Sequence, residues 1–423
     1  MPKRKKIILV LGAGIAGLRV VQRLQKRLPN THEIILVDKS PVHVFSSDLY
    51  QVATVFSKKI TETCLARIKE TVATPISRLV DPWKVTYIQS EVTGIDPKAK
   101  KVFLKSGSPL KFDLLVVALG SVTKFFDVPG VKEYAYPLKI VTDALAVNCQ
   151  IDHLFLQRYK SKSKEAIVIT IAGGGATGVE VAGELMGTLD KLCKKYKHDP
   201  KKVTVQLIQS GETLAAFDAK GTKLIKDELE KMGVQVYLEH RVTALKKTKV
   251  ELLRKFDGES ISLPCHMLIW TCGVQVNPVV AKSLGDPKLR GAIAVRSTLE
   301  TKKHTHIFAL GDCARVRRSP HSKDYVPMMA QYAMQEADIM AANILRRIQQ
   351  RPLKQFHMGV PLYVVPVGFN FTLFKVKDWT FKGMWTQWLK PIITLKYALA
   401  ILPLRRAWQK FRLGEAIWEQ NDL

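Results

Sequence analysis

The sequence predicts an α/β protein with two doubly wound domains, each built on a parallel sheet, followed by amphipathic C-terminal helices. Three observations support this fold class. The chain of 423 residues is roughly three times the ~150 residues of a typical domain. An apolar strand pattern runs directly into a glycine-rich turn and a helix pattern at two places. The C-terminal part gathers Trp residues among Lys and Arg, which is typical of helices at a membrane surface.

The composition is that of a folded protein with an excess of positive charge. Hydrophobic residues make up 47% and charged residues 24%, which excludes collagen-like and disordered classes. The net charge of +29 predicts an anionic neighbour, either nucleic acid or an anionic membrane, although a generally basic proteome would give the same sum. The six cysteines form no CxxC pair, so no metal site is expected and the compartment is predicted to be reducing.

The first glycine motif follows an apolar strand pattern at residues 6–11. Its glycines, Gly12, Gly14 and Gly17, have the GxGxxG spacing and lead into a helix pattern. The first glycine permits a tight turn, the second lets the backbone approach a pyrophosphate, and the third allows the helix to pack closely on the strand. The next strand ends at Asp38, where a carboxylate can accept hydrogen bonds from a ribose diol. This segment predicts a Rossmann-like dinucleotide site.

The same pattern recurs later in the chain. A strand at residues 166–172 leads into Gly173, Gly175 and Gly178 and a further helix pattern, so two dinucleotides are expected. The strand after this helix ends at Gln209 instead of an acid. A carboxylate would repel the 2′-phosphate of NADPH and an amide would not, so the sequence permits NADPH beside NADH. No Lys or Arg stands next to Gln209 to attract that phosphate.

Two further segments are typical of strands that return to the first domain of a flavin fold. Residues 112–121 form an apolar run through Ala118 that ends at Gly120, where the chain would cross to the second domain. Residues 306–314 form another, which ends at Gly311 and Asp312. The Asp312 carboxylate could bind a ribityl hydroxyl or orient water at the pyrophosphate. Simple core strands are the alternative interpretation of both segments.

With these motifs the sequence resembles the type II NADH:quinone oxidoreductases, a branch of the FAD/NAD(P) disulfide-reductase superfamily. Phe45 and the LYQVAT segment at residues 49–54 are similar to one motif of that family. The AQYAMQ segment at 330–335 resembles its AQxAxQ motif at the quinone end of the flavin. The GGGATGVEVAGEL segment resembles its second glycine motif, including Glu180 beside the nicotinamide, and WTCGV at 270–274 resembles a further segment.

The sequence departs from that family at two places and differs from the related branches in its cysteines. Ser47 and Asp48 stand where the family usually has Pro-Leu, which predicts a more polar wall of the flavin or quinone site. Gln209 replaces the usual nucleotide-selecting acid. The closely spaced thiols of disulfide reductases and the late cysteine of the sulfide:quinone branch are missing, so a thiol relay is not expected, and Cys313 is interpreted as a buried small residue.

The resemblance implies a single-subunit, non-proton-pumping respiratory enzyme. It would transfer a hydride from NADH, or NADPH, to FAD and then two electrons to a membrane quinone. The implied catalytic residues are Glu180, Gln331 and Gln335. The expected FAD- and NAD(P)H-binding residues are Gly12, Gly14, Ala16, Gly17, Asp38, Lys39, Val92, Ala118, Gly120, Gly173, Gly175, Thr177, Gly178, Gln209, Gly273, Gly311, Asp312 and Gln331. The expected quinone-pocket residues are Phe45, Tyr50, Ala330, Gln331 and Met334. His43 is a candidate proton donor, with a structural histidine as the alternative.

The tail is expected to dock on a membrane without crossing it. Its best apolar stretch, residues 391–404, contains Lys396 and is shorter than the ~20 residues a spanning helix needs. Trp385 and Trp388 begin an apolar series at near-helical spacing. Lys382, Lys390, Lys396, Arg405 and Arg406 are expected on the polar side, where they can reach anionic lipid headgroups. A helix that covers the core or a homodimer interface is the alternative.

The predicted domains are residues 1–122 and 291–355 for FAD, 123–290 for an inserted NAD(P)H domain, and 356–423 for membrane docking. The expected location is the inner face of the cytoplasmic membrane, or of an equivalent respiratory membrane, with no nucleic acid as partner. Two other functions stay open. A soluble NAD(P)H-dependent flavoreductase would share the fold but would have no need of the tail. A flavoprotein resembling the apoptosis factors would account for the charge by binding nucleic acid or a protein partner.

Overall fold

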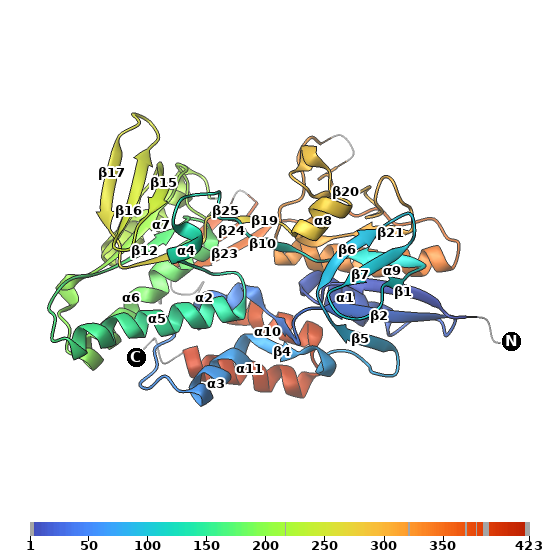
Figure 1. Ribbon diagram of the computed structural model, residues 1–423, viewed down its shortest axis with the longest axis horizontal. Coiled ribbons are helices and arrows are strands. Elements are labelled where there is room, and N and C mark those ends of the chain that lie inside the picture. Colours follow the sequence, from blue (N-terminus) through green and yellow to red (C-terminus); the bar gives the residue numbers. More distant parts are fainter. Residues whose placement is uncertain are drawn as a thin grey trace. The chain divides into compact units, whose positions relative to one another are not determined.

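The computed structural model describes residues 4–215, 217–319, 322–368, 370–377, 379–383 and 389–418. The chain forms two compact units (Figure 1). Unit 1 comprises Met1–Phe45, Ala73–Val122 and Val274–Gly359, and unit 2 comprises Ser46–Val72, Thr123–Gly273 and Val360–Leu423. These units divide the chain differently from the predicted domains. The chain re-enters unit 1 at Val274 rather than at residue 291, and the C-terminal segment belongs to unit 2.

Unit 1 is built on a five-stranded parallel sheet. The strand order is β21 (Ile307–Ala309), β9 (Leu114–Val117), β1 (Lys6–Leu11), β2 (His32–Asp38) and β5 (Val85–Gln89). The central strand β1 is an apolar run with four fully buried residues at its end, as expected for a strand covered on both faces. The predicted parallel sheet of the first domain is therefore confirmed.

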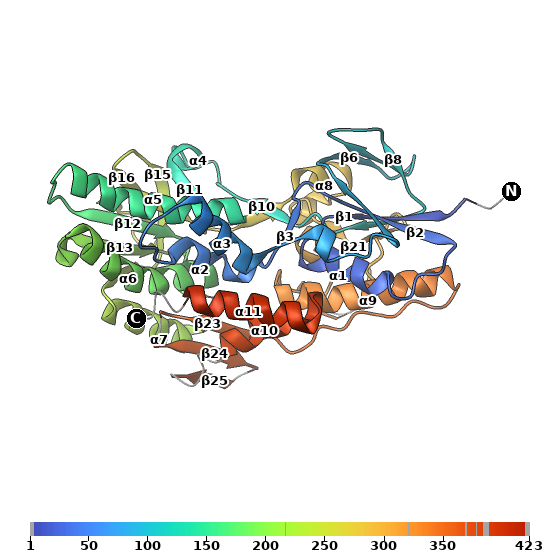
Figure 2. The ribbon, with the colours of Figure 1, turned by 90° about the horizontal axis from the view of Figure 1, so that it is seen from below.

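Helices α1 (Ile15–Leu24) and α9 (Ala330–Ile348) lie side by side in unit 1 (Figures 1 and 2). Arg19 on α1 donates two hydrogen bonds to the carboxylate of Asp338 on α9, at 2.9 and 3.2 Å. Arg23, one helical turn further along α1, donates to the same carboxylate at 2.7 Å. These contacts fix the N-terminal half of α9 against the helix that follows the first glycine turn.

Shorter elements complete unit 1. These are β3 (Val42–Val44) paired with β4 (Ala73–Pro75), the antiparallel sheet β6 (Val92–Asp96), β7 (Lys101–Leu104) and β8 (Leu110–Lys111), the pair β20 (Ile293–Ala294) and β22 (Ala314–Arg315), and helix α8 (Pro278–Ser283).

Unit 2 repeats the same architecture. Its parallel sheet has the order β11 (Ala135–Pro137), β18 (Met267–Trp270), β12 (Ile167–Ala172), β13 (Val203–Ile208) and β14 (Val234–Tyr237). Here too the strand that precedes the glycine turn, β12, is central and fully buried. Helices α4 (Val131–Tyr134), α5 (Val141–Lys160), α6 (Ala176–Tyr196) and α7 (Ala219–Lys231) and the antiparallel strands β15 (His240–Leu245), β16 (Lys249–Arg254) and β17 (Ser260–Pro264) surround it.

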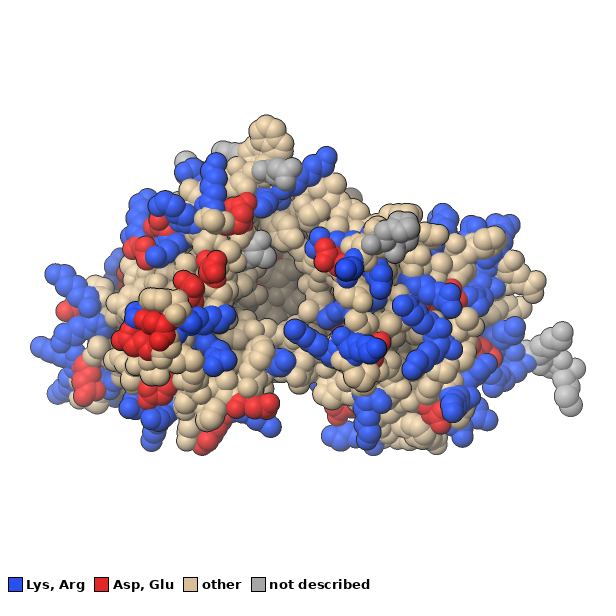
Figure 3. Space-filling model, turned by 90° about the horizontal axis from the view of Figure 1, so that it is seen from above, with Lys and Arg blue, Asp and Glu red and all other residues tan. Residues whose placement is uncertain are grey.

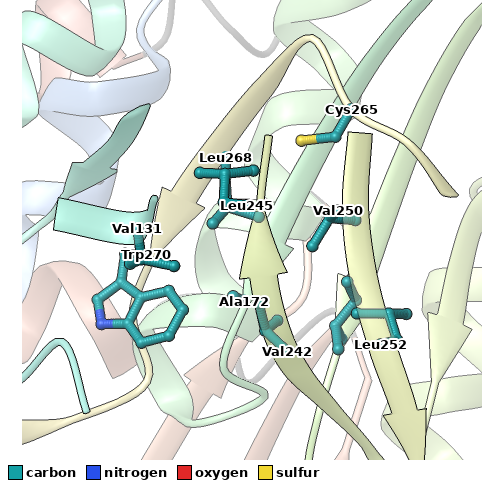
Figure 4. Packing of buried hydrophobic residues seen from close by; sticks show 10 residues of the cluster. Val131, Ala172, Val242, Leu245, Val250, Leu252, Cys265, Leu268 and Trp270 are labelled. Carbon is teal, nitrogen blue, oxygen red and sulfur yellow. The ribbon is translucent and has the colours of Figure 1, made fainter. Parts of the chain in front are cut away.

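A hydrophobic cluster in unit 2 supports the end of β18. Val131 packs beside the indole of Trp270, and Val242, Val250 and Leu252 extend the cluster across the antiparallel sheet (Figure 4). The Trp270 indole is buried, and its N–H donates to the Lys124 carbonyl at 2.8 Å, which satisfies the one polar atom of the ring. The cluster thereby fixes the backbone that continues to Thr271 and Gly273.

The C-terminal segment packs on helices of unit 2. Strands β23 (Leu362–Pro366), β24 (Thr372–Val376) and β25 (Trp379–Lys382) form an antiparallel sheet. A Cβ on Gly183 of α6 would lie 2.2 Å from the Gly368 nitrogen, so only glycine allows this contact. Helices α10 (Leu389–Ile401) and α11 (Leu404–Trp418) contact each other, and α11 contacts α3 (Glu62–Val72) (Figure 2). Among the described residues, no helix combines the length and apolarity needed to cross a bilayer.

Figure 3 shows how the charged side chains are distributed over one face of the molecule. On this face Lys and Arg side chains are widely spread, and Asp and Glu are interspersed among them.

Candidate functional site

The first glycine turn has the shape that a pyrophosphate site requires. Gly12 has φ +98°, and a Cβ there would lie 2.3 Å from the Ala118 carbonyl oxygen. A Cβ on Gly17 would lie 1.9 Å from the Gly12 carbonyl oxygen. Gly14, by contrast, has nothing within 4 Å of its Cβ position and begins α1 without a side-chain cap. The turn therefore packs tightly against the protein at Gly12 and Gly17. It leaves open space at Gly14, where phosphate oxygens would accept hydrogen bonds from the N–H groups of the helix.

Two side chains hold this turn, those of the half-buried Asp38 and the buried His43. Asp38, the last residue of β2, accepts hydrogen bonds from the Ala13 N–H at 2.6 Å and the Ser40 N–H at 2.7 Å. Burial raises the pKa of the Asp38 carboxyl, and the two backbone N–H groups act in the opposite direction. His43 Nδ1 lies 2.7 Å from the Ala13 carbonyl oxygen and the residue is buried. This contact supports the structural interpretation of His43 over a role as proton donor.

A second set of predicted FAD residues lies where β9 and β21 end. Ala118 is buried and faces Gly12 and Gly17, and Gly120 follows it. Asp312 accepts a 2.5 Å hydrogen bond from the Ser121 hydroxyl. Glu336 on α9 accepts a 2.7 Å hydrogen bond from the Gly311 N–H. Burial raises the pKa of Glu336 to about 7; the Gly311 N–H and Arg315 lower it, and Asp312 adds to the increase.

Helix α9 begins at the predicted AQxAxQ segment. Ala330, Gln331, Met334 and Gln335 are all partly exposed there. Gln335 Oε1 accepts a hydrogen bond from the Gly359 N–H at 3.2 Å, so this amide also fixes the chain that leaves α9. The side chains are placed by the Arg19–Asp338 contact one turn further along the helix.

Other predicted residues of unit 1 surround the same sheet. Phe45 is buried directly after β3, and Val92 is buried at the start of β6. Ala16 is buried in the first turn of α1, 3.5 Å from where a Cβ on Gly311 would lie. Lys39 is exposed, so its ammonium is free to face solvent or an anionic ligand beside Asp38.

The second glycine turn, in unit 2, has the same geometry as the first. Gly173 has φ +107°, and a Cβ there would lie 2.7 Å from the Thr271 carbonyl carbon. A Cβ on Gly178 would lie 1.8 Å from the Gly173 carbonyl oxygen, whereas Gly175 has nothing within 4 Å. Thr177 is exposed in the first turn of α6, and Gly273 accepts a 3.1 Å hydrogen bond from the Lys124 N–H.

Gln209 has in unit 2 the structural role that Asp38 has in unit 1. Its Oε1 accepts a 3.0 Å hydrogen bond from the Gly174 N–H, just as Asp38 accepts from Ala13, the corresponding residue of the first turn. Its Nε2 donates to the Thr213 carbonyl at 2.9 Å. Gln209 therefore holds the turn with an uncharged side chain.

Glu180 lies in a buried, charged environment in unit 2. It is the fifth residue of α6 and is buried. Burial raises the pKa of Glu180 to about 8; the ammonium of Lys390 lowers it, and Asp48 and Glu184 add to the increase. Tyr50, a predicted quinone-pocket residue, is buried with the Lys390 ammonium 5.0 Å from the centre of its ring. These residues form one group within unit 2.

The position of Lys390 corrects a sequence-based expectation. The sequence predicts this lysine on the polar side of the tail, within reach of lipid headgroups. In the structure its side chain is only 14% exposed, and its Nζ lies 3.0 Å from Asp48 Oδ1. Burial acts to lower the pKa of Lys390, but the Asp48 and Glu180 carboxylates outweigh it and the pKa is raised. Helical spacing does not distinguish a buried from an exposed lysine on α10, because Lys396 of the same helix is exposed. Trp385 and Trp388 lie outside the described residues.

All six cysteines are free thiols in the structure. Cys313 is fully buried, its thiol donates to the Val117 and Leu310 carbonyls, and burial raises its pKa to about 12. A thiol with so high a pKa is a poor nucleophile, which fits the interpretation of Cys313 as a buried small residue.

Sequence reasoning did not assign three residues to these sites. Ser121, Glu336 and Lys390 each bind a predicted site residue or its backbone. Glu336 adjoins the AQxAxQ segment, and an acid on the buried face of a helix could have marked it. The other two contacts join segments far apart in the chain and left no local signal.

The comparisons with known proteins agree with this geometry. A family model described as pyridine nucleotide-disulphide oxidoreductase matches residues 6–337. A type II NADH:quinone oxidoreductase of Staphylococcus aureus (strain NCTC 8325 / PS 47) is 31% identical over 360 residues, 84% of this chain and 86% of the relative. A solved structure of NDH2 from Plasmodium falciparum in complex with NADH has TM-score 0.84 at 17% identity, over 99% of each chain. The sulfide:quinone oxidoreductase of Aquifex aeolicus has TM-score 0.77 at 20% identity, over 97% of this chain and 92% of that one.

The second glycine turn yields a test of which glycine serves folding and which serves the ligand. Gly178→Ala should lower the stability by about 1–3 kcal/mol, because its Cβ would meet the Gly173 carbonyl oxygen. Gly175→Ala should fold normally but bind a pyridine dinucleotide about tenfold more weakly, because the methyl group would occupy the open face of the turn. Thermal unfolding and dinucleotide titration check the two effects. Equal dinucleotide affinity in wild type and Gly175→Ala would contradict this assignment.

Proposed function

The chain belongs to the pyridine nucleotide-disulphide oxidoreductases and, within them, to the type II NADH:quinone oxidoreductases, and from this premise we propose how its residues serve that reaction. The enzyme uses FAD to oxidise NADH and reduce a quinone. The observation that carries the assignment to residues is the pair of equivalent glycine turns, each closed toward its sheet and open at the helix N-terminus.

We assign FAD to the turn of unit 1. Gly14 and the N-terminus of α1 would bind the pyrophosphate, and Asp38 and Lys39 would lie at the adenosine ribose. Asp312, Gly311 and Ala118 would hold the part of the cofactor near the ends of β9 and β21, with Ser121 and Glu336 fixing Asp312 and Gly311. When bound, FAD supplies the carrier chemistry that takes a hydride from NADH and passes two electrons to the quinone.

We assign NADH to the turn of unit 2. Gly175, Thr177 and the N-terminus of α6 would bind its pyrophosphate, and Gln209 would lie at its adenosine ribose. Glu180, further along α6, would lie beside the nicotinamide. Because burial raises its pKa to about 8, the Glu180 carboxyl can hold a proton at neutral pH. Reduction of a quinone to a quinol takes up two protons, so a buried carboxyl that holds one near neutrality suits this half of the reaction.

We propose that residues of unit 1 contribute to the quinone site. Ala330, Gln331, Met334 and Gln335 lie at the start of α9, and Phe45 lies directly after β3. The Gln331 and Gln335 amides would supply hydrogen-bonding groups for quinone oxygens, and Phe45 would supply apolar contact for the ring. In unit 2, Tyr50 on α2 (Leu49–Thr54) stays a further predicted quinone contact.

We further propose that α10 and α11 dock on an anionic membrane surface. Ile392 on α10 is 57% exposed, and Leu404 and Trp408 on α11 are 73% and 51% exposed. Exposed cations lie among them, at Lys396, Arg405 and Arg406. An apolar surface next to cations suits the headgroup boundary of an anionic leaflet, which favours the inner face of the respiratory membrane. A homodimer stays a separate prediction that sedimentation of the detergent-free protein can test.

The proposed reaction is tested by its two halves. The purified yellow protein should lose its flavin absorbance on addition of NADH without oxygen and regain it on addition of a short-chain quinone. Stopped-flow absorbance measures both steps. Bleaching by NADH without recovery by quinone would instead favour a flavoreductase with another acceptor. A preparation that NADH does not bleach, but that binds DNA in a salt-dependent way, would favour the apoptosis-factor-like alternative.

Nucleotide preference tests the position of Gln209. Gln209→Glu should lower kcat/KM for NADPH relative to NADH by about tenfold, because a carboxylate repels a 2′-phosphate. The matched control is Gln235→Glu, which adds the same charge on an exposed position of β14. An unchanged NADPH/NADH ratio in Gln209→Glu would mean that the position does not contact the ribose.

Vesicle binding tests the docking surface. The double variant Leu404→Ser/Trp408→Ser should bind phosphatidylglycerol-containing vesicles about tenfold or more weakly, because it removes two exposed apolar side chains. Trp83→Ser is the matched control, since Trp83 is 95% exposed in unit 1 and outside the proposed surface. Co-sedimentation measures binding. Equal losses in both variants would count against α10 and α11 as the docking surface.

A further inference from the structure

Asp48 and Lys390 form a buried ion pair within unit 2. The Lys390 Nζ lies 3.0 Å from Asp48 Oδ1, and the two side chains are 14% and 4% exposed. The same ammonium donates to the Ser47 carbonyl at 3.1 Å, and the Thr394 hydroxyl donates to Asp48 Oδ2 at 3.2 Å. These bonds join the segment before α2 to the first turns of α10.

Removing these two charges from water is unfavourable, so each charge needs a partner within the protein. Burial of either charge alone would strongly destabilise the folded protein. The Asp48 carboxylate and the Lys390 ammonium compensate each other. The family that the sequence resembles usually has leucine at this position, and leucine could not pair with a buried cation.

Other charged groups face the pair. The Lys390 ammonium interacts with Glu180 and Glu184 of α6 as well as with Asp48. Asp48 also interacts with Glu180 and with Lys410 of α11, whose own pKa burial lowers to about 8. Lys410 in addition donates to the Glu70 carbonyl of α3 at 2.8 Å. Lys390 therefore interacts with Asp48 and with two acids of α6, Glu180 and Glu184.

We propose that Asp48 is a positioning residue of the enzyme, which holds the Lys390 ammonium in a buried ion pair and so fixes both α10 and the positive charge that acts on Glu180. The inference rests on the proposed role of Glu180 at the nicotinamide. Without the Asp48 carboxylate, the Lys390 ammonium would interact with Glu180 and Glu184 of α6 alone among these three acids. The α10 helix would lose its charged link to the segment that leads into Tyr50.

The charges predict opposite effects for the two single variants. Asp48→Asn removes a negative charge that raises the pKa of Glu180, so that pKa should fall. Lys390→Met removes a positive charge that lowers the pKa of Glu180, so that pKa should rise. The corresponding limb of the kcat profile with pH should move by about one pH unit, toward lower pH in Asp48→Asn and toward higher pH in Lys390→Met. A role in stability alone would move neither limb.

The ion pair itself is tested without turnover, by thermal unfolding of the FAD-loaded protein. Asp48→Asn and Lys390→Met should each lower Tm by roughly 5 °C, because each leaves one buried charge without its ion-pair partner at 3.0 Å. The double variant Asp48→Asn/Lys390→Met should lose clearly less than the sum of the two single losses. Asp227→Asn is the control, since it breaks the exposed Lys223–Asp227 pair of α7 and should change neither Tm nor the pH profile.

The outcomes separate the inference from the proposed function. Additive losses of Tm would show that the pair does not form and would overturn the inference. Coupled losses of Tm with an unchanged kcat profile against pH would show that Asp48 contributes to stability alone. This result would also overturn the inference. A wild-type protein that NADH does not bleach would overturn the proposed function, while the unfolding cycle would still report on the pair. Coupled losses with limbs that move in opposite directions support the inference.

Discussion

Close contact between backbone segments, with no room for a Cβ, is the constraint on which both units depend. In unit 1 the carbonyl of Gly12 occupies the space of a side chain on Gly17, and in unit 2 Gly173 and Gly178 repeat the contact. The contact draws each helix onto its central strand, so that the first helical N–H groups point outward from the sheet. The chain has thus used one local solution twice. One side chain completes each turn. Asp38 in unit 1 and Gln209 in unit 2 each accept a hydrogen bond from the N–H of the residue after the first glycine.

Most of the fold could be predicted because it depends on local patterns. The glycine spacing, the apolar strands and the acid at the end of β2 are all read within about thirty residues, and the two parallel sheets form as these patterns indicate. The comparisons then assign the chain to the family that the motifs at Phe45, Glu180 and Gln331 had suggested. The boundaries of the units were less accessible to sequence reasoning. The segment Ser46–Val72 joins unit 2 through tertiary contacts of α2 and α3, which no sequence pattern announces.

The charged interior was the least predictable part of the site. Lys390 and Lys396 have the same side chain on the same short helix, yet one is buried against Asp48 and the other is exposed. The difference arises from a partner more than three hundred positions away in the chain, so helical spacing could not distinguish them. Asp48 could be noticed only as an unexpected polar residue. Likewise, Glu336 had no evident purpose until the structure placed its carboxylate on the Gly311 N–H.

The contact between Gly183 and Gly368 joins the C-terminal segment to helix α6. Helix α6 carries both the second glycine turn and Glu180, and the chain between β23 and β24 lies directly against it. Lys375 of β24 adds a 2.8 Å hydrogen bond to Asp218, the N-cap of α7. The C-terminal segment is therefore built into the nucleotide-binding body instead of trailing from it. If the docking proposed above holds, a force that a bilayer exerts on this segment would reach α6, the helix that carries both the second glycine turn and Glu180.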